Sequence, residues 1–172
     1  MIVHGGYNVS DEMIKARRLG HRREFVTQVV FLLNITKVGN KAYALADNLI
    51  VLDIPEGVKS IGAEAFYGCR SLTTISFPTT LLVIKHMAFF SCKSLENVDF
   101  LHTDLQEIGH GAFGRCSELK MMTFPDSLQT LGEAVFMECS KLVPSHIDIY
   151  ETSDVVGHFH SLQSKMWIEE VD

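Results

Sequence analysis

The sequence repeats one short phrase at an almost constant interval. Each copy has a small apolar residue followed by phenylalanine, with cysteine three residues after the phenylalanine and leucine three residues after the cysteine. The four copies begin at Ala65, Ala88, Ala112 and Val135, so that successive spacings are 23, 24 and 23 residues. A period of this length is typical of a solenoid, in which each repeat buries its apolar side only by stacking on its neighbours. The repeat therefore predicts a chain that extends along one axis.

Residues that recur at the period form columns, because they must occupy the same place in every coil. One apolar column precedes each phrase, and another lies three residues earlier. After each cysteine comes a leucine, then an apolar residue three positions after the leucine and a second apolar residue two positions further on. A proline follows three of these segments. Period-2 alternation that ends in proline predicts a short strand in each coil. The residues concerned are Ile61, Ile84, Ile108 and Leu131; Val58, Leu81, Leu105 and Leu128; Leu72, Ile75 and Phe77; Leu95, Val98 and Phe100; and Pro55, Pro78 and Pro125.

The same columns extend beyond the four copies in both directions. Upstream, residues 35–55 fit a degenerate coil with Tyr43 in the phenylalanine position. Residues 25–33 fit an opening strand, with a helix as the alternative, and residues 159–168 fit a decayed last coil. We therefore expect three segments, namely an N-terminal capping helix and strand in 1–30, leucine-rich-repeat coils in 31–150 and a degenerate C-terminal capping coil in 151–172.

In these columns the chain resembles the BspA-type leucine-rich repeat family, whose 23-residue repeat has the order Ile-Gly-x-x-Ala-Phe-x-x-Cys-x-x-Leu-x-x-Ile-x-Ile-Pro. The resemblance covers residues 31–150. It implies a right-handed α/β solenoid with a parallel sheet on the concave side and short helical or 3₁₀ turns on the convex side. It also implies protein–protein recognition or cell adhesion, with no catalytic position in the repeats. The chain departs from the pattern at Lys85, Leu101 and Val135, and by one extra residue in the segment 101–104.

The concave sheet is the leading surface for binding, because its outward side chains alternate with buried columns and form a grid across the coils. The grid is small and polar with a mild negative bias, and it lacks the Trp, Tyr and Arg typical of a strong hot spot. A solvated face without a partner is the alternative, and the irregular segment 101–104 is a second candidate contact region. The grid positions are Val51, Asp53, Thr74, Ser76, Asn97, Asp99, Met121, Thr123, Pro144 and His146. The candidate partner-binding residues among them are Asp53, Thr74, Ser76, Asn97, Asp99, Met121, Thr123 and His146.

The cysteines and histidines have structural explanations. Each of the four cysteines occupies the repeat's own cysteine column, which predicts buried free thiols; disulfides and a thiol nucleophile are the alternatives. No C-x-x-C pair is present, and His158 with His160 gives only two ligands, so we expect no metal site. The sequence has no phosphate-binding glycine loop, paired-carboxylate motif or nucleophile elbow. We therefore expect a protein that is not an enzyme and needs no cofactor.

Charge and hydropathy bear on the partners. The first 23 residues hold five cations and two acids, a net charge of +3. Because the whole chain has a net charge of −6, the remaining residues have a net charge of −9. Residues 10–20 fit a capping helix, with acids in the first turn and cations toward its end at Gly20. The alternative is a nucleic-acid-binding segment, but five cations beside an acidic body make a poor footprint for it, so we expect no nucleic-acid partner. The longest apolar run, 29–33, is far shorter than the ~18 residues of a membrane span. The first residues lack signal-peptide features, so we expect a cytoplasmic protein if the chain is complete, and a surface or secreted one if a leader is missing.

These observations favour a non-catalytic module that binds a protein of unknown identity. The alternative is a self-associating scaffold whose copies stack through their solenoid ends. Weak self-association is consistent with both interpretations.

Overall fold

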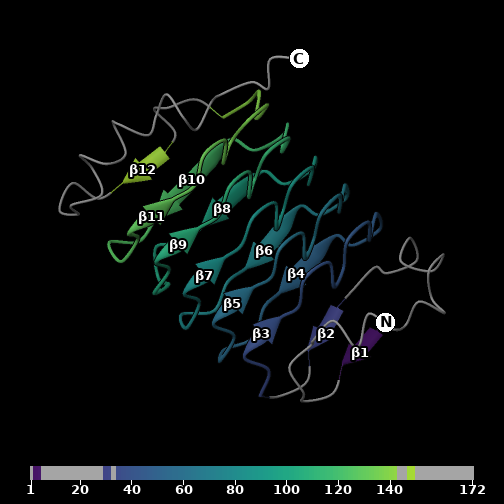
Figure 1. Cartoon of the computed structure of the whole chain (residues 1–172). Coiled ribbons are helices and arrows are strands. Elements are labelled where there is room, and N and C mark those ends of the chain that lie inside the picture. Colours follow the sequence, from purple (N-terminus) through teal and green to yellow (C-terminus); the bar gives the residue numbers. More distant parts are fainter. Residues whose placement is uncertain (1, 5–28, 32–33, 143–146, 150–172) are drawn as a thin grey trace.

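Parallel strands stacked in successive coils make up the computed structural model of the chain (Figure 1). It describes residues 2–4, 29–31, 34–142 and 147–149. This part of the chain is a parallel β-solenoid, as the repeat predicts, and a full coil contains a long strand, a short strand and a turn segment. The strands are β1 (Ile2–His4), β2 (Val29–Phe31), β3 (Lys37–Val38), β4 (Val51–Asp53), β5 (Ser60–Ile61), β6 (Thr74–Ser76), β7 (Val83–Ile84), β8 (Asn97–Asp99), β9 (Glu107–Ile108), β10 (Met121–Phe124), β11 (Thr130–Leu131) and β12 (Ile147–Ile149).

The long strands carry the alternation that the sequence predicts. In β4, the buried Leu52 lies between the exposed Val51 and Asp53. β4 pairs with β6, and β10 pairs with both β8 and β12, always in parallel. Residues one repeat apart face each other, as Val51 faces Thr74. The register stays constant because a slip of one residue would turn every buried side chain outward.

A second sheet consists of two-residue strands that the sequence pattern does not predict. Its order is β11-β9-β7-β5-β3, and the buried Ile61 and Ile84 are in register in it. The glycine that follows the isoleucine has a packing reason, because a Cβ on Gly62 would lie 2.6 Å from the backbone nitrogen of Asn40 in the preceding coil. Lys85 replaces this glycine in the next coil and still donates its N–H to the carbonyl of Ile61 at 3.0 Å.

The turn segments hold the Ala-Phe phrases. The helical or 3₁₀ turns expected there are not found, since the described residues contain no helix. Glu64 and Gly68 have φ angles of 54° and 69°, and left-handed residues at this spacing interrupt a right-handed helix. The N–H of Phe66, which lies between them, instead donates to the carbonyl of Ala88 in the next coil at 2.8 Å. The third side of the solenoid is therefore also joined from coil to coil by backbone hydrogen bonds.

A column of aromatic rings runs through the core, as predicted. Tyr43, Phe66, Phe89 and Phe113 stack with centroid distances of 5.3, 5.2 and 5.2 Å and interplanar angles of 5–9°. The fifth ring of the column, Phe136, is fully buried and packs against Phe124 at 6.4 Å. Stacking neighbouring coils thus hides the rings that a single repeat would leave exposed.

The four cysteines are free and buried, as predicted. Each thiol donates to a backbone carbonyl of an earlier coil, so that the column of cysteines satisfies buried acceptors along the core. The pairs are Cys69 with Tyr43 at 3.2 Å, Cys92 with Phe66 at 3.3 Å, Cys116 with Phe89 at 3.3 Å and Cys139 with Phe113 at 3.1 Å.

At the N-terminal end of the described chain, β1 pairs in parallel with β2. The sequence predicts a strand within residues 25–33, but it gives no sign of the partner β1. The ring of Phe31 meets that of Tyr43 edge-on at 5.9 Å, so β2 contacts the aromatic column. The predicted basic helix at 10–20 and the capping coil at 151–172 lie outside the described residues.

Candidate functional site

The long strands place most of the predicted binding residues on one surface, which we call the long-strand face. Its residues point outward from strands whose intervening side chains fill the core. All are exposed except Thr123, which is half-buried, whereas Pro144 and His146 lie outside the described residues. The pairs in register are Val51 with Thr74, Asp53 with Ser76, Asn97 with Met121 and Asp99 with Thr123.

Asp99 is held firmly on this face. Its carboxylate accepts hydrogen bonds from the hydroxyl of Thr123 and, at 2.9 Å, from the backbone N–H of Leu101. These bonds lower the pKa of Asp99, because they favour the charged carboxylate. Asp99 is therefore a fixed negative charge that remains exposed to solvent.

The irregular segment 101–104 is well anchored despite its extra residue. Thr103 is buried, and its hydroxyl donates to the carbonyl of Phe100 at 2.8 Å. In the next coil, the hydroxyl of Ser127 donates to the carbonyl of Leu105 at 2.9 Å. The same bond occurs at a regular coil, where the hydroxyl of Thr80 donates to the carbonyl of Val58 at 3.0 Å, so the extra residue does not disturb this contact. His102, within the segment, is exposed.

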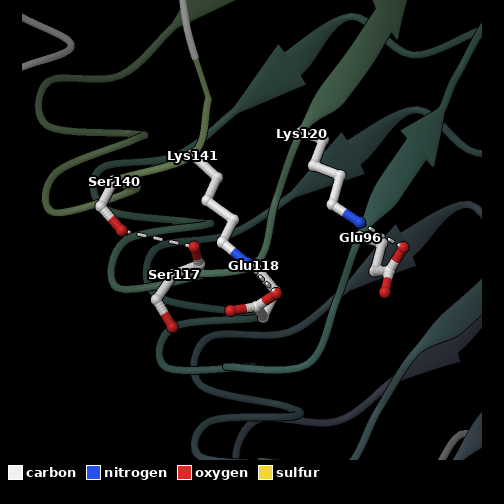
Figure 2. Close-up of polar contacts among 6 residues, drawn as sticks. All are labelled: Glu96, Ser117, Glu118, Lys120, Ser140 and Lys141. Atoms are coloured by element: carbon white, nitrogen blue, oxygen red, sulfur yellow. Dashed lines mark hydrogen bonds and ion pairs between the residues drawn. The ribbon is translucent and has the colours of Figure 1, made fainter.

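A group of charged residues beside the face was missed by the sequence analysis (Figure 2). Glu96 and Lys120 directly precede β8 and β10, and their carboxylate and ammonium groups lie 2.8 Å apart. Glu118 and Lys141 form a similar pair at 2.5 Å. The hydrogen bond with Lys120 lowers the pKa of Glu96 and raises that of Lys120. Opposite charges one repeat apart are the sequence signal that predicts such pairs.

These ion pairs are exposed, so solvent and salt screen them and they contribute little to stability. The N-terminal coil has no such ion pair at the equivalent position among the described residues. The position equivalent to Glu96 and Lys120 is occupied there by Ile50, a residue that is 50% exposed. This one position beside the face therefore changes along the solenoid from the apolar Ile50, through Thr73, to the charged Glu96 and Lys120.

The part of the chain that the structure describes contains no group of three or more His, Cys, Asp or Glu residues arranged to hold a metal ion. Burial raises the pKa of Cys92 and Cys116, which keeps these thiols protonated. Within the same residues, no helix has the length and apolar character needed to cross a bilayer.

Comparison with known proteins decides the family. The model of the BspA type leucine rich repeat region matches residues 24–157 with six copies. The chain belongs to the BspA-type leucine-rich repeat family. Leucine-rich repeat proteins generally mediate protein–protein interaction or adhesion, and members of this family and their structural neighbours are typically binding proteins without enzymatic activity. No curated protein matches the chain.

Solved structures show the same fold. A leucine-rich repeat protein of T. pallidum is 34% identical over 64% of the chain, with a TM-score of 0.63. The pneumococcal vaccine antigen PcpA is 19% identical over 80% of the chain, with a TM-score of 0.56, and a leucine-rich repeat protein of Eubacterium ventriosum is 16% identical over 87%, with a TM-score of 0.59. The matched regions cover 51%, 40% and 37% of those proteins. This BspA-type chain therefore spans about half the length of the T. pallidum protein and less than half the length of the other two.

Proposed function

We propose that this BspA-type chain is a non-catalytic recognition module that binds a protein partner through the long-strand face. The observation that supports this is the register of the outward side chains, such as Asp53 with Ser76 and Asp99 with Thr123. Equivalent residues of adjacent coils lie about 4.8 Å apart across a β-ladder. An extended partner segment therefore meets regularly spaced contacts along each of the two ladders, β4 with β6 and β8 with β10.

The composition of the face indicates the chemistry of the partner. Asp53 and Asp99 are exposed carboxylates, and the long-strand face contains no cation among its described residues. Val51 and Met121 are each 44% exposed and offer apolar contact area at opposite ends of the face. We infer a partner that presents basic side chains between two apolar groups. Because aromatic anchors are absent from these positions, we expect affinity to arise from many modest contacts.

Site-specific photocrosslinking tests the proposal. A photoreactive amino acid at Thr74 or Asn97 probes the long-strand face, and the same amino acid at Lys59 or Gln129, exposed residues that directly precede short strands, serves as the matched control. In extracts of the source organism, the first two positions should capture the same protein and the controls should not. Equal capture at all four positions, or capture at the controls alone, contradicts the proposal.

The same experiment separates the scaffold alternative. If the captured protein is a second copy of the chain, sedimentation should show mass that grows with concentration. Open-ended growth of this kind would favour end-to-end stacking, because heterologous contacts that do not close produce filaments. A constant monomer mass together with a different captured protein favours recognition.

A further inference from the structure

The long strands do not form one continuous sheet. β4 pairs with β6, and β10 pairs with both β8 and β12, but β6 and β8 belong to different sheets. Figure 1 shows β6 and β8 at successive levels of the stack. On the short-strand side, β5, β7 and β9 pair without interruption. We call the interruption between Thr74–Ser76 and Asn97–Asp99 the seam.

Two backbone hydrogen bonds that recur at the neighbouring interfaces are missing at the seam. One is donated by the residue before a long strand to the preceding coil, and the other by the residue after a long strand to the next coil. At the seam the equivalent donors are Glu96 and Phe77, and within the described residues neither makes such a bond. The bonds at the neighbouring interfaces, with the donor first, are Thr73 to Ile50 at 2.9 Å, Lys120 to Glu96 at 2.8 Å, Ile54 to Ser76 at 3.0 Å and Phe100 to Thr123 at 3.2 Å.

Core packing changes at the same place. Ile75 and Phe77 of the β6 segment are only half-buried. The residues at the equivalent positions of the other coils are nearly inaccessible. These are Leu52 at 0%, Val98 at 2% and Met122 at 0% exposure, and Ile54 at 4%, Phe100 at 0% and Phe124 at 2%. Missing backbone bonds and reduced burial are independent signs of weak local packing, and both occur at this seam.

The other two sides of the same coil interface are intact. On the short-strand side, the N–H of Gly109 donates to the carbonyl of Ile84 at 2.8 Å. On the turn side, the N–H of Phe89 donates to the carbonyl of Ala112 at 2.8 Å. On the long-strand side the strands do not pair, although the rings of Phe77 and Phe100 lie 4.5 Å apart and the N–H of Asp104 donates to the carbonyl of Thr79 at 2.9 Å. Two coils that are paired along two sides and held by fewer contacts along the third have the arrangement of a hinge.

We propose that the solenoid flexes at this seam, with the short-strand sheet and the turn segments as the hinge. Opening the seam changes the distance between Asp53, Thr74 and Ser76 on one side and Asn97 and Asp99 on the other. A partner that contacts both groups selects one opening, since a ligand shifts an equilibrium toward the state that it binds better. The motion itself does not depend on whether the long-strand face binds a protein.

Spin labels at matched positions test the hinge. The pair Thr74→Cys with Asn97→Cys spans the seam. The controls Val51→Cys with Thr74→Cys, and Asn97→Cys with Met121→Cys, span intact ladders at the equivalent positions, and each shares one label site with the seam pair. The native cysteines are buried, so labelling of the folded chain is confined to the new thiols. The distance distribution of the seam pair should be longer and at least about twofold broader than either control, and three equal distributions would overturn the hinge.

Amide hydrogen exchange of the full chain gives a second test. Phe77 and Glu96 should exchange faster than Ile54 and Lys120, their equivalents at the neighbouring interfaces. Phe89 and Gly109 should remain protected, because their bonds belong to the hinge. If those two exchange as fast as Phe77, the coils separate on all three sides and the hinge is wrong. If Phe77 and Glu96 are as protected as their equivalents, the seam does not open.

Discussion

Replacing Phe113 by alanine should weaken the fold more than any exposed substitution. Phe113 has no exposed surface, stacks on Phe89 at 5.2 Å and meets Phe100 edge-on at 6.0 Å. Returning such a side chain to water costs about 2–3 kcal/mol. The cavity left between two stacked coils adds to that cost, because neighbouring rings are held by their own coils and collapse only partly. We therefore expect Phe113→Ala to lower the free energy of unfolding by about 3–5 kcal/mol in total.

Urea unfolding of Phe113→Ala beside Tyr67→Ala measures the effect. Tyr67 stacks on Phe90 at 5.4 Å with nearly parallel rings, but it is half-buried and lies outside the main core. Replacing it by alanine should lower the free energy of unfolding by about 1 kcal/mol, because this half-buried ring mainly loses its stacking on Phe90. The transition slope should stay constant for both variants. Equal losses of stability at the two positions would contradict this expectation, because burial in the aromatic column would then add nothing to the free energy of unfolding.

Three further results are expected. The four buried cysteines should not react with a thiol reagent until the chain unfolds, and rapid labelling of two or more in the folded protein would count against the packed column. Because the folded-state pKa of Asp99 is lowered, its stabilising contribution should be full above the usual aspartate pKa of about 4 and lost as the pH falls through the lowered value. The free energy of unfolding of Asp99→Asn, measured across that pH window, should lack this part of the acid dependence, and the same pH dependence in both proteins would contradict it. Deleting residues 1–31 should uncover the strand columns of the first coil and cause aggregation in size-exclusion chromatography, whereas a monomer with an unchanged melting temperature would show that the segment is not a cap.

The long strands and the core could be predicted because every repeat carries the same pattern, so each copy supports the interpretation of the others. Phe66, Phe89 and Phe113 occupy the same position of successive repeats, which indicates the same buried environment in each coil. Such agreement does not arise by chance. The outward residues of the candidate site follow from the same logic, since alternation along a strand fixes which side chains leave the core. The alternation therefore predicts correctly that Thr74 and Asn97 are exposed on the surface.

The second sheet and the turns could not be predicted from the same signals. Two-residue strands such as β5 are too short for alternation, and only the glycine after Ile61 indicated a close approach of two backbones. The left-handed conformations of Glu64 and Met87 have no sequence signature, because the hydrogen bonds of the neighbouring coil impose them. The pairing of β1 with β2 joins segments 27 positions apart that share no repeat column. The seam depends on differences between coils that a repeat pattern averages out.

The most direct test of the proposed recognition surface is a residue-resolved NMR titration of the labelled chain with the protein captured by photocrosslinking. We expect the largest chemical-shift changes at Thr74, Ser76, Asn97 and Asp99 on the long-strand face. Amides of the short-strand sheet, such as Ile61 and Ile108, should change little. Changes concentrated on the short-strand sheet or the turn segments, with the long-strand face unaffected, would contradict the claim that this face is the recognition surface.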